Sequence, residues 1–214
     1  MNHNQIFEKP EILYEDEYFI IVNKEAEELT VPGRGEDKQH CLLSRTSTYY
    51  KEVFNVHRLD QPTSGLVIIA LTKEMQSQLS LLFRERQIEK EYIAIVEGVI
   101  DDDSGIIDFP LRADVENRPV QIVDRELGKS AVTRWSVLER YKYKTRILLK
   151  PETGRTHQLR VHMNALGHAI EGDRLYNDKC SENIFGELKL HAMSIKFTHP
   201  VSGDILSVVK PPRF

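Results

Sequence analysis

The chain of 214 residues carries a formal net charge of −4, with a sequence pI of about 6.1. This balance excludes a generally basic nucleic-acid coat protein, whose pI would usually exceed roughly 9. Hydrophobic residues make up 40% of the chain and charged residues 29%, which is ordinary for a globular protein of this size. No apolar run approaches the ~18–20 residues of a membrane-spanning helix, so no membrane partner is expected.

The N-terminal residues and the two cysteines indicate the cellular compartment of the protein. Residues 1–10 are polar, lack the basic-then-apolar layout of a signal peptide and are expected to be flexible. Cys41 and Cys180 lie far apart in no metal-ligand spacing, so we expect free thiols in the cytoplasm and no metal site. Residues 11–214 show no repeat and no long linker, and are expected to form a single domain.

The hydrophobic pattern predicts many short strands and few helices. Strands are expected at residues 11–23 (two, around an acidic turn), 66–71, 88–98, 106–112, the end of 117–123, 129–141, 143–149, 191–198 and 205–209. Helices are expected at residues 37–50, 72–87 and 156–166. Because hairpins connect most of these strands, the sequence predicts an α+β fold on a mainly antiparallel or mixed central sheet with flanking helices.

Several of these elements have specific signals at their ends. Residues 18–22 are apolar throughout, as in a central buried strand. Asp37 is the expected N-cap of the first helix and Thr72 that of the second. Gly167 is the expected stop signal after the third helix.

Charge is unevenly distributed along the chain. From Arg140 to Arg160 there are seven basic residues and one acid, Glu152, whereas acids gather at residues 25–28 and 101–103. Such segregation can create a local phosphate-binding face. A solvated strand face that alternates with the core explains the same residues, and both interpretations can hold for one strand.

One stretch, residues 56–70, combines ionisable side chains, a turn and a buried strand. His57, Arg58 and Asp60 come first, a Pro-Thr-Ser-Gly turn follows, and an aliphatic run ends the stretch. Asp60 is therefore expected at the mouth of a turn that a rigid strand supports, with Arg58 keeping its carboxylate ionised. An Asp that opens a turn and caps nearby N–H groups is the alternative.

Two other places hold side chains that could carry chemistry. Tyr92 lies on the strand expected at 88–98, where it shares one face with Lys90 and Ala94. A core-facing tyrosine with its hydroxyl at the rim is the alternative there. Residues 154–160, Gly-Arg-Thr-His-Gln-Leu-Arg, open a helix and could bind an anion, although a helix with exposed polar residues would have the same sequence.

These three places resemble the motifs of one enzyme family. His-Arg-Leu-Asp at residues 57–60, followed by Thr-Ser-Gly at 63–65, is similar to the catalytic motif of the RluA-type pseudouridine synthases. Arg-Gln-Ile-Glu-Lys-Glu-Tyr at 86–92 and Pro-Glu-Thr-Gly-Arg-Thr-His-Gln-Leu-Arg-Val-His at 151–162 resemble the second and third motifs of the family. The resemblance runs from about residue 12 to residue 212, without an S4-type RNA-binding extension.

Carried over by position, the resemblance implies a role for each motif residue. Asp60 would be the catalytic carboxylate, Tyr92 would stack on the target base, and Arg155 would hold Asp60. The remaining motif side chains would contact RNA or support the site; they are Arg58, His57, Thr63, Ser64, Gln158 and Arg160. For His57, a hydrogen-bonded structural role is favoured over acid–base chemistry. The resemblance also implies the pseudouridine-synthase fold, with an active-site cleft across the sheet.

The implied reaction isomerises uridine to pseudouridine in RNA. The N-glycosidic bond breaks, the uracil turns and a C–C bond forms, so nothing enters or leaves and no cofactor is expected. The target base must be flipped out of its stack at a cost of a few kcal/mol, whereas stacking on an aromatic ring is worth ~1–3 kcal/mol. Unstacked loop bases are the usual targets of RNA recognition, so a loop or hairpin RNA is the expected partner of a monomeric enzyme.

The resemblance also narrows the substrate. Residues 31–34 and 110–119 resemble a branch of the family that modifies both a 23S rRNA hairpin and the first nucleotide of the tRNA anticodon loop. An aromatic residue expected near Val115 is absent, which puts one loop contact in question but not the reaction. The alternatives within the family are a tRNA-only or an rRNA-only synthase.

Two alternatives lie outside this chemistry. A non-catalytic RNA-binding module on the same fold would need no Asp–Arg pair, so the presence of Asp60, Tyr92 and Arg155 argues against it. A carboxylate-dependent glycosidase would need a second catalytic carboxylate, and no second Asp or Glu stands in a comparable turn.

Overall fold

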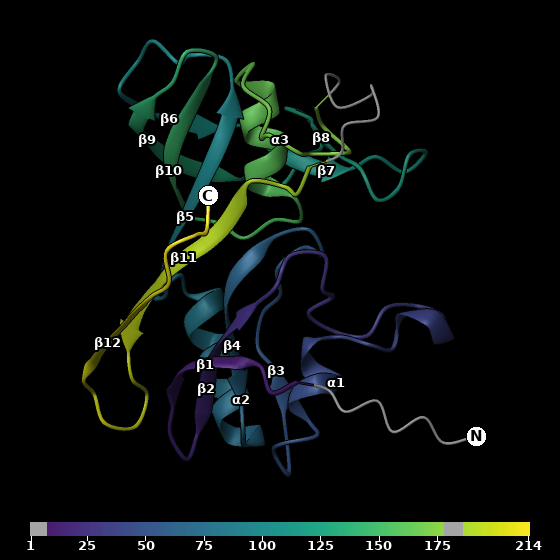
Figure 1. The fold of residues 1–214 in the computed structure, drawn as a ribbon, viewed down its shortest axis with the longest axis vertical. Coiled ribbons are helices and arrows are strands. Elements are labelled where there is room, and N and C mark those ends of the chain that lie inside the picture. The colour runs from purple at the N-terminus through teal and green to yellow at the C-terminus, as the bar shows by residue number, and fades with distance from the viewer. Residues whose placement is uncertain (1–7, 178–185) are drawn as a thin grey trace. The chain divides into compact units, whose positions relative to one another are not determined.

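The computed structural model describes residues 8–177 and 186–214, which form two compact units. The first unit contains the chain up to Ile88 together with Lys196–Lys210, and the second contains Glu89–Ile195 with Pro211–Phe214. Within the described residues, strands predominate and three α-helices accompany them (Figure 1). Most of the N-terminus expected to be flexible lies outside the described residues, and so does Cys180.

The first unit is built on antiparallel strands. Strand β2 (Phe19–Lys24) pairs with β1 (Glu11–Glu15) on one side and with β4 (Ser64–Ala70) on the other, and the short β3 (Phe54–Asn55) also pairs with β4. All six residues of β2 are buried, which confirms the prediction of a central strand at 18–22. A strand that is buried on both faces needs a nearly continuous run of apolar residues, and β2 begins with such a run.

The helices of the first unit begin at side-chain caps. Helix α2 (Lys73–Arg84) begins after Thr72, whose Oγ1 accepts a hydrogen bond from the Met75 N–H at 3.1 Å, as predicted. The first predicted helix is much shorter than expected: α1 spans Leu42–Thr46, and a 3-10 turn, η1 (Glu36–Lys38), precedes it. The N-cap is Cys41 and not Asp37. Cys41 has an extended backbone, its Sγ accepts a hydrogen bond from the Ser44 N–H, and its own N–H donates to Ser44 Oγ.

The second unit has its own antiparallel strands. Their order is β5 (Glu89–Glu97), β10 (Lys144–Pro151), β9 (Val132–Arg140) and β6 (Ser104–Asp108). The pairing of β9 with β10 confirms the predicted hairpin at 129–149.

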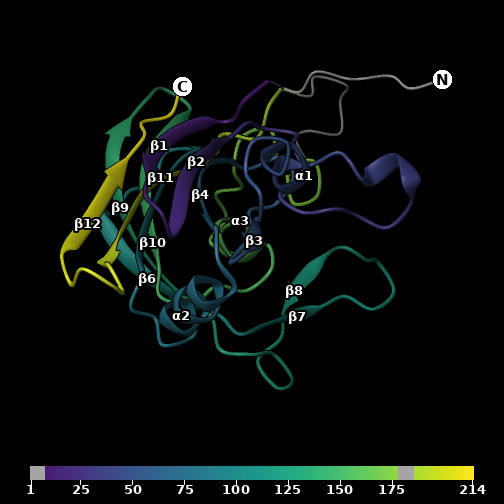
Figure 2. The same ribbon diagram turned by 90° about the horizontal axis from the view of Figure 1, so that it is seen from below.

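The strand expected at residues 106–112 is split in two. Pro110 cannot donate to a ladder, so the chain leaves β6 and starts β7 (Leu111–Ala113). Strand β7 pairs with β8 (Gln121–Val123) in a separate two-stranded sheet, which Figure 2 shows as a hairpin with a long loop at its tip.

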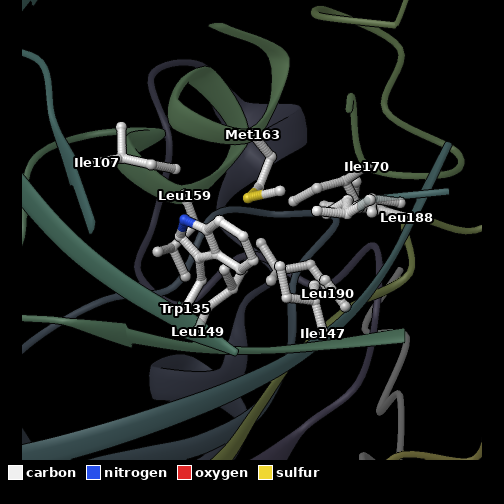
Figure 3. Close-up of a cluster of buried hydrophobic side chains, with 12 residues drawn as sticks. Ile107, Trp135, Ile147, Leu149, Leu159, Met163, Ile170, Leu188 and Leu190 are labelled. Carbon is white, nitrogen blue, oxygen red and sulfur yellow. The ribbon is translucent and has the colours of Figure 1, made fainter. Parts of the chain in front are cut away.

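Helix α3 (Gln158–Ala165) packs on strands β5, β10, β9 and β6 through a cluster of buried side chains. Figure 3 shows Leu159 and Met163 of the helix beside Trp135. The buried members of the cluster are Ala94, Val96, Ile100, Ile107, Trp135, Ile147, Leu149, Leu159, Met163, Ile170, Leu188 and Leu190. Gly167, with φ of +91°, ends the helix as predicted, since the left-handed region favours glycine. The core therefore fixes the helix that carries the third motif.

The C-terminal strands also agree with the prediction. Strand β11 (Leu190–Thr198) runs from the second unit into the first, and β12 (Ile205–Val209) pairs with it. The turn after β11 is anchored within the first unit, where His199 Nε2 lies 2.8 Å from Asp16 Oδ2. No helix of the described residues is long and apolar enough to cross a membrane.

The basic stretch from Arg140 to Arg160 is not a free cationic face. Arg140 bonds to Asp103 and to the carbonyls of residues 100–102, so the acidic loop that is distant in sequence folds onto it. Lys144 pairs with Glu171 and Lys150 with Glu91. Strand pairing and loop closure bring these acids to the bases, which offsets much of the predicted local charge.

Candidate active site

Asp60 opens a tight turn at the start of β4, as the sequence predicts. The Thr63 N–H donates to the Asp60 carbonyl at 3.0 Å, and Ser64 begins the strand. Gly65 follows with φ of +114°, a conformation that glycine adopts at little cost. Asp60 itself is half-buried. The carboxylate therefore stands on a short turn in front of a buried strand.

The backbone on both sides of Asp60 is held by buried side chains. Thr30 Oγ1 accepts from the Leu59 N–H at 3.1 Å and donates to the Leu59 carbonyl at 2.9 Å. Lys24 Nζ donates to the Gln61 carbonyl at 3.0 Å. Two side chains that precede the motif by about thirty residues thus fix the peptide groups next to the aspartate.

Lys24 is the more unusual of these two supports, because its side chain is fully buried. Its ammonium group also donates to the carbonyls of Glu25 at 2.8 Å and Glu28 at 2.6 Å, so three acceptors surround it. Burial lowers the pKa of Lys24 from 10.5 to about 8, and the negative charges of Glu28 and Asp60 act in the opposite direction. At neutral pH, Lys24 is thus a buried cation that interacts electrostatically with Asp60.

The other residues of the first motif have distinct environments. His57 is structural, since its Nε2 accepts from the Ile68 N–H at 2.9 Å and its ring lies 4.4 Å from that of Phe83. Arg58 is exposed and Ser64 half-buried, so both can reach a ligand. Thr63 is only 3% exposed, which favours a role in the turn over direct contact with RNA.

Tyr92 belongs to the second unit, on β5 opposite Leu149 of β10. It is half-buried and packs against the hydrophobic cluster. Lys90 lies two residues before it on the same face of the strand. Burial lowers the pKa of Lys90.

The turn before α3 is held by Gln158, which is 4% exposed. The Gln158 Oε1 accepts from the Thr153 hydroxyl at 2.7 Å and from the Arg155 N–H at 3.0 Å. Its Nε2 donates to the Val132 carbonyl and to Thr133 Oγ1, both at 3.0 Å. All four hydrogen-bonding positions of the amide are used inside the protein, which favours a structural role over direct contact with RNA.

Arg155 projects from this turn and is exposed. Its Nε donates to the Ser130 carbonyl at 3.0 Å. Nothing lies within 4 Å of the position where a Cβ would stand on the preceding Gly154, so the turn has open space beside it. Arg155 is in the second unit and Asp60 in the first.

Arg160 is buried, in contrast to Arg155. Its guanidinium makes two bonds of 2.7 Å to the two oxygens of Asp173, and the pair is nearly inaccessible to solvent. Its Cζ lies 5.1 Å from the ring centre of Tyr176. The Tyr176 hydroxyl is 2.7 Å from His157 Nδ1, and His157 has a left-handed φ of +53° at the N-cap of α3.

Sequence reasoning missed the residues that support these motifs. Lys24 is a polar side chain at the end of an apolar strand and Thr30 lies in the loop that follows it, so neither carries a local signal of its role. Asp173 and Tyr176 stand in a segment that resembles the family, Gly-Asp-Arg-Leu-Tyr, which could have suggested partners for Arg160. The burial of these supporting side chains depends on the folded chain and cannot be predicted from the sequence pattern.

Known proteins that are similar to this chain belong to one family. Residues 18–165 match the model of the RNA pseudouridylate synthase family. The dual-specificity RNA pseudouridine synthase RluA of Salmonella typhimurium is 44% identical over 204 residues, which is 95% of this chain and 93% of that protein. RluA of Escherichia coli K12 is 43% identical with the same coverage.

Solved structures give the same result. Human RNA pseudouridylate synthase domain containing 1 superposes with a TM-score of 0.82 at 29% identity, covering 100% of this chain and 87% of that one. Human RNA pseudouridylate synthase domain containing 4 gives 0.78 at 27% identity, covering 95% and 89%. The predicted pseudouridine-synthase fold is confirmed.

The family match, which spans more than half of the chain, defines an RNA pseudouridine synthase, an isomerase that acts on RNA. With its close likeness to RluA over nearly its whole length, the chain belongs to the RluA-type pseudouridine synthases, as its motifs predict.

Proposed function

We propose that this enzyme isomerises uridines at two sites, one in a 23S rRNA hairpin and one at the first nucleotide of the tRNA anticodon loop. The observation that carries the proposal is the 44% identity, over nearly the whole of both chains, to a relative named as dual-specificity. The match includes the segments at 31–34 and 110–119 that resemble the dual-specificity branch. The proposed enzyme works as a monomer in the cytoplasm, where both RNAs are found.

Asp60 is the proposed catalytic carboxylate. Its half-buried position on a turn that Thr30 and Lys24 fix suits a group that must be aimed at one atom of a flipped nucleotide. Tyr92 offers a partly accessible ring on which the uracil can stack. Arg155 is the proposed cation that acts with Asp60, and its exposure leaves the guanidinium free to change partner when RNA binds.

The remaining motif residues divide into RNA contacts and supports. Arg58 and Ser64 are the proposed RNA contacts, because both reach solvent. His57, Thr63, Gln158 and Arg160 act indirectly, since each is held by, or buried among, protein groups. Base flipping requires the exposed groups to replace stacking that the RNA loses.

The substrate is tested with two transcripts that carry 5-³H-uridine, a tRNA anticodon stem-loop and the rRNA hairpin. Isomerisation moves the glycosidic bond to C5, so each turnover releases tritium to water. Release from both transcripts is the expected result. Release from one transcript alone would reduce the proposal to a single-substrate synthase. Binding of both without release would favour a non-catalytic RNA-binding module.

A further inference from the structure

The hydroxyl of Thr30 makes both of its hydrogen bonds to the backbone of one residue, Leu59. Thr30 is 4% exposed, and its Oγ1 both accepts from the Leu59 N–H and donates to the Leu59 carbonyl. Leu59 is itself 5% exposed, so neither of its peptide groups has water as an easy substitute. Because a hydroxyl has a single proton, the bond to the carbonyl fixes its rotor. One side chain therefore sets the backbone of the residue that precedes Asp60.

Thr30 is anchored in turn by the start of α1. The first free N–H groups of that helix donate to the chain beside Thr30: Leu42 N to the Leu29 carbonyl at 2.8 Å and Leu43 N to the Thr30 carbonyl at 3.1 Å. Arg45 of the same helix makes two bonds to the Glu28 carboxylate, at 2.9 Å and 2.8 Å. Residues 28–30 are thus tied to a helix by four hydrogen bonds.

On the other side of Asp60, Lys24 holds the Gln61 carbonyl, as described above. The aspartate therefore stands between two residues, Leu59 and Gln61, whose peptide groups are bonded to side chains about thirty residues earlier in the chain. Fixing the Cα and Cβ of a side chain in this way restricts the directions in which its functional group can point. Catalytic groups need such preorganisation, since a misplacement of about 1 Å can cost about 100-fold in rate.

From these contacts we infer that Thr30 is a positioning residue for Asp60, which sets the direction of the carboxylate through the Leu59 backbone. The inference rests on the proposed catalytic role of Asp60. Thr30 does not touch the substrate in this scheme, so its loss changes the chemical step and leaves RNA binding intact.

The test compares Thr30→Val, which keeps the shape and removes the hydroxyl, with Thr30→Ser, which keeps the hydroxyl. Thr46→Val is the matched control, because Thr46 is equally buried in the same unit but its hydroxyl bonds within α1, to Leu42 at 2.7 Å. We expect Thr30→Val to lower kcat about ten- to a hundredfold with KM within about twofold. Thr30→Ser should stay within about threefold of wild type, and Thr46→Val should leave kcat unchanged.

Several results would overturn the inference. They are a Thr30→Val enzyme that folds and keeps its kcat, a loss expressed in KM, a Thr30→Ser enzyme as slow as the valine variant, or an equal loss of kcat in Thr46→Val. Amide hydrogen exchange at Leu59 tests the contact without any substrate. Loss of protection there in Thr30→Val supports the inference, and unchanged protection refutes it. If the wild type releases tritium from neither transcript, the proposed function fails, and the exchange at Leu59 still decides whether Thr30 holds this backbone.

Discussion

The buried ammonium group of Lys24 gives the fold a pH dependence that can be measured. In the unfolded chain its pKa is the ordinary value of 10.5, whereas burial lowers it to about 8 in the folded protein. Between these values the unfolded chain holds a proton that the folded one has released, so raising the pH favours folding. The two pKa values imply a gain of about 2 kcal/mol from this group between pH 7 and about pH 9.5.

Lys24→Met removes the titration while keeping an unbranched apolar side chain of similar length. Urea unfolding of both proteins at intervals from pH 7 to about pH 9.5 gives the free energy of unfolding at each pH. The wild type is expected to gain about 2 kcal/mol relative to the variant over this range. Exposed groups contribute equally to both proteins and cancel in the difference. Parallel curves for the two proteins would refute the reasoning.

Three further outcomes follow from the second unit. Asp173→Asn is expected to destabilise the protein by about 3–5 kcal/mol in urea unfolding, because Arg160 keeps its buried charge and loses its partner; a change below about 1 kcal/mol contradicts this. Tyr176→Phe removes the acceptor of the Gln121 N–H, at 2.8 Å, so amide exchange at Gln121 should speed up, and unchanged exchange would count against that bond. Burial lowers the pKa of His162 below 6.5. The unfolded chain therefore binds a proton more readily than the folded one, and the free energy of unfolding should fall as the pH drops below about 6.5. A His162→Asn variant should lose this dependence on pH.

Much of the fold was accessible from local pattern. The apolar run at 18–22, the cap at Thr72 and the glycine at 167 each specify their element through nearest neighbours, and the structure confirms them. The helix expected at 37–50 is present, but its predicted bounds and N-cap were wrong, because Cys41, a weak capping residue by type, starts the helix in place of Asp37. The split of the strand at 106–112 follows from Pro110, whose effect the sequence prediction did not include.

The motif residues could be found from the sequence, whereas their surroundings could not. Asp60 stands at the mouth of its turn, as predicted, because a turn and its strand are contiguous in the chain. Thr30 and Lys24 lie about thirty residues away, and only the folded backbone brings their polar atoms to Leu59 and Gln61. The acids that offset the basic stretch are equally distant in sequence, so counting charges along the chain overestimated its positive field.

The catalytic role of Asp60 is tested by measuring tritium release by Asp60→Asn from the transcript that the wild type modifies. Asn keeps the size and removes the charge, and binding of the same transcript is measured in parallel. Asp102→Asn, at an exposed acid of the second unit, serves as the control. If Asp60 is the catalytic carboxylate, Asp60→Asn gives no release above background with binding retained, and the control gives full release. Release by Asp60→Asn at more than about a tenth of the wild-type rate would show that the carboxylate is not the catalytic group.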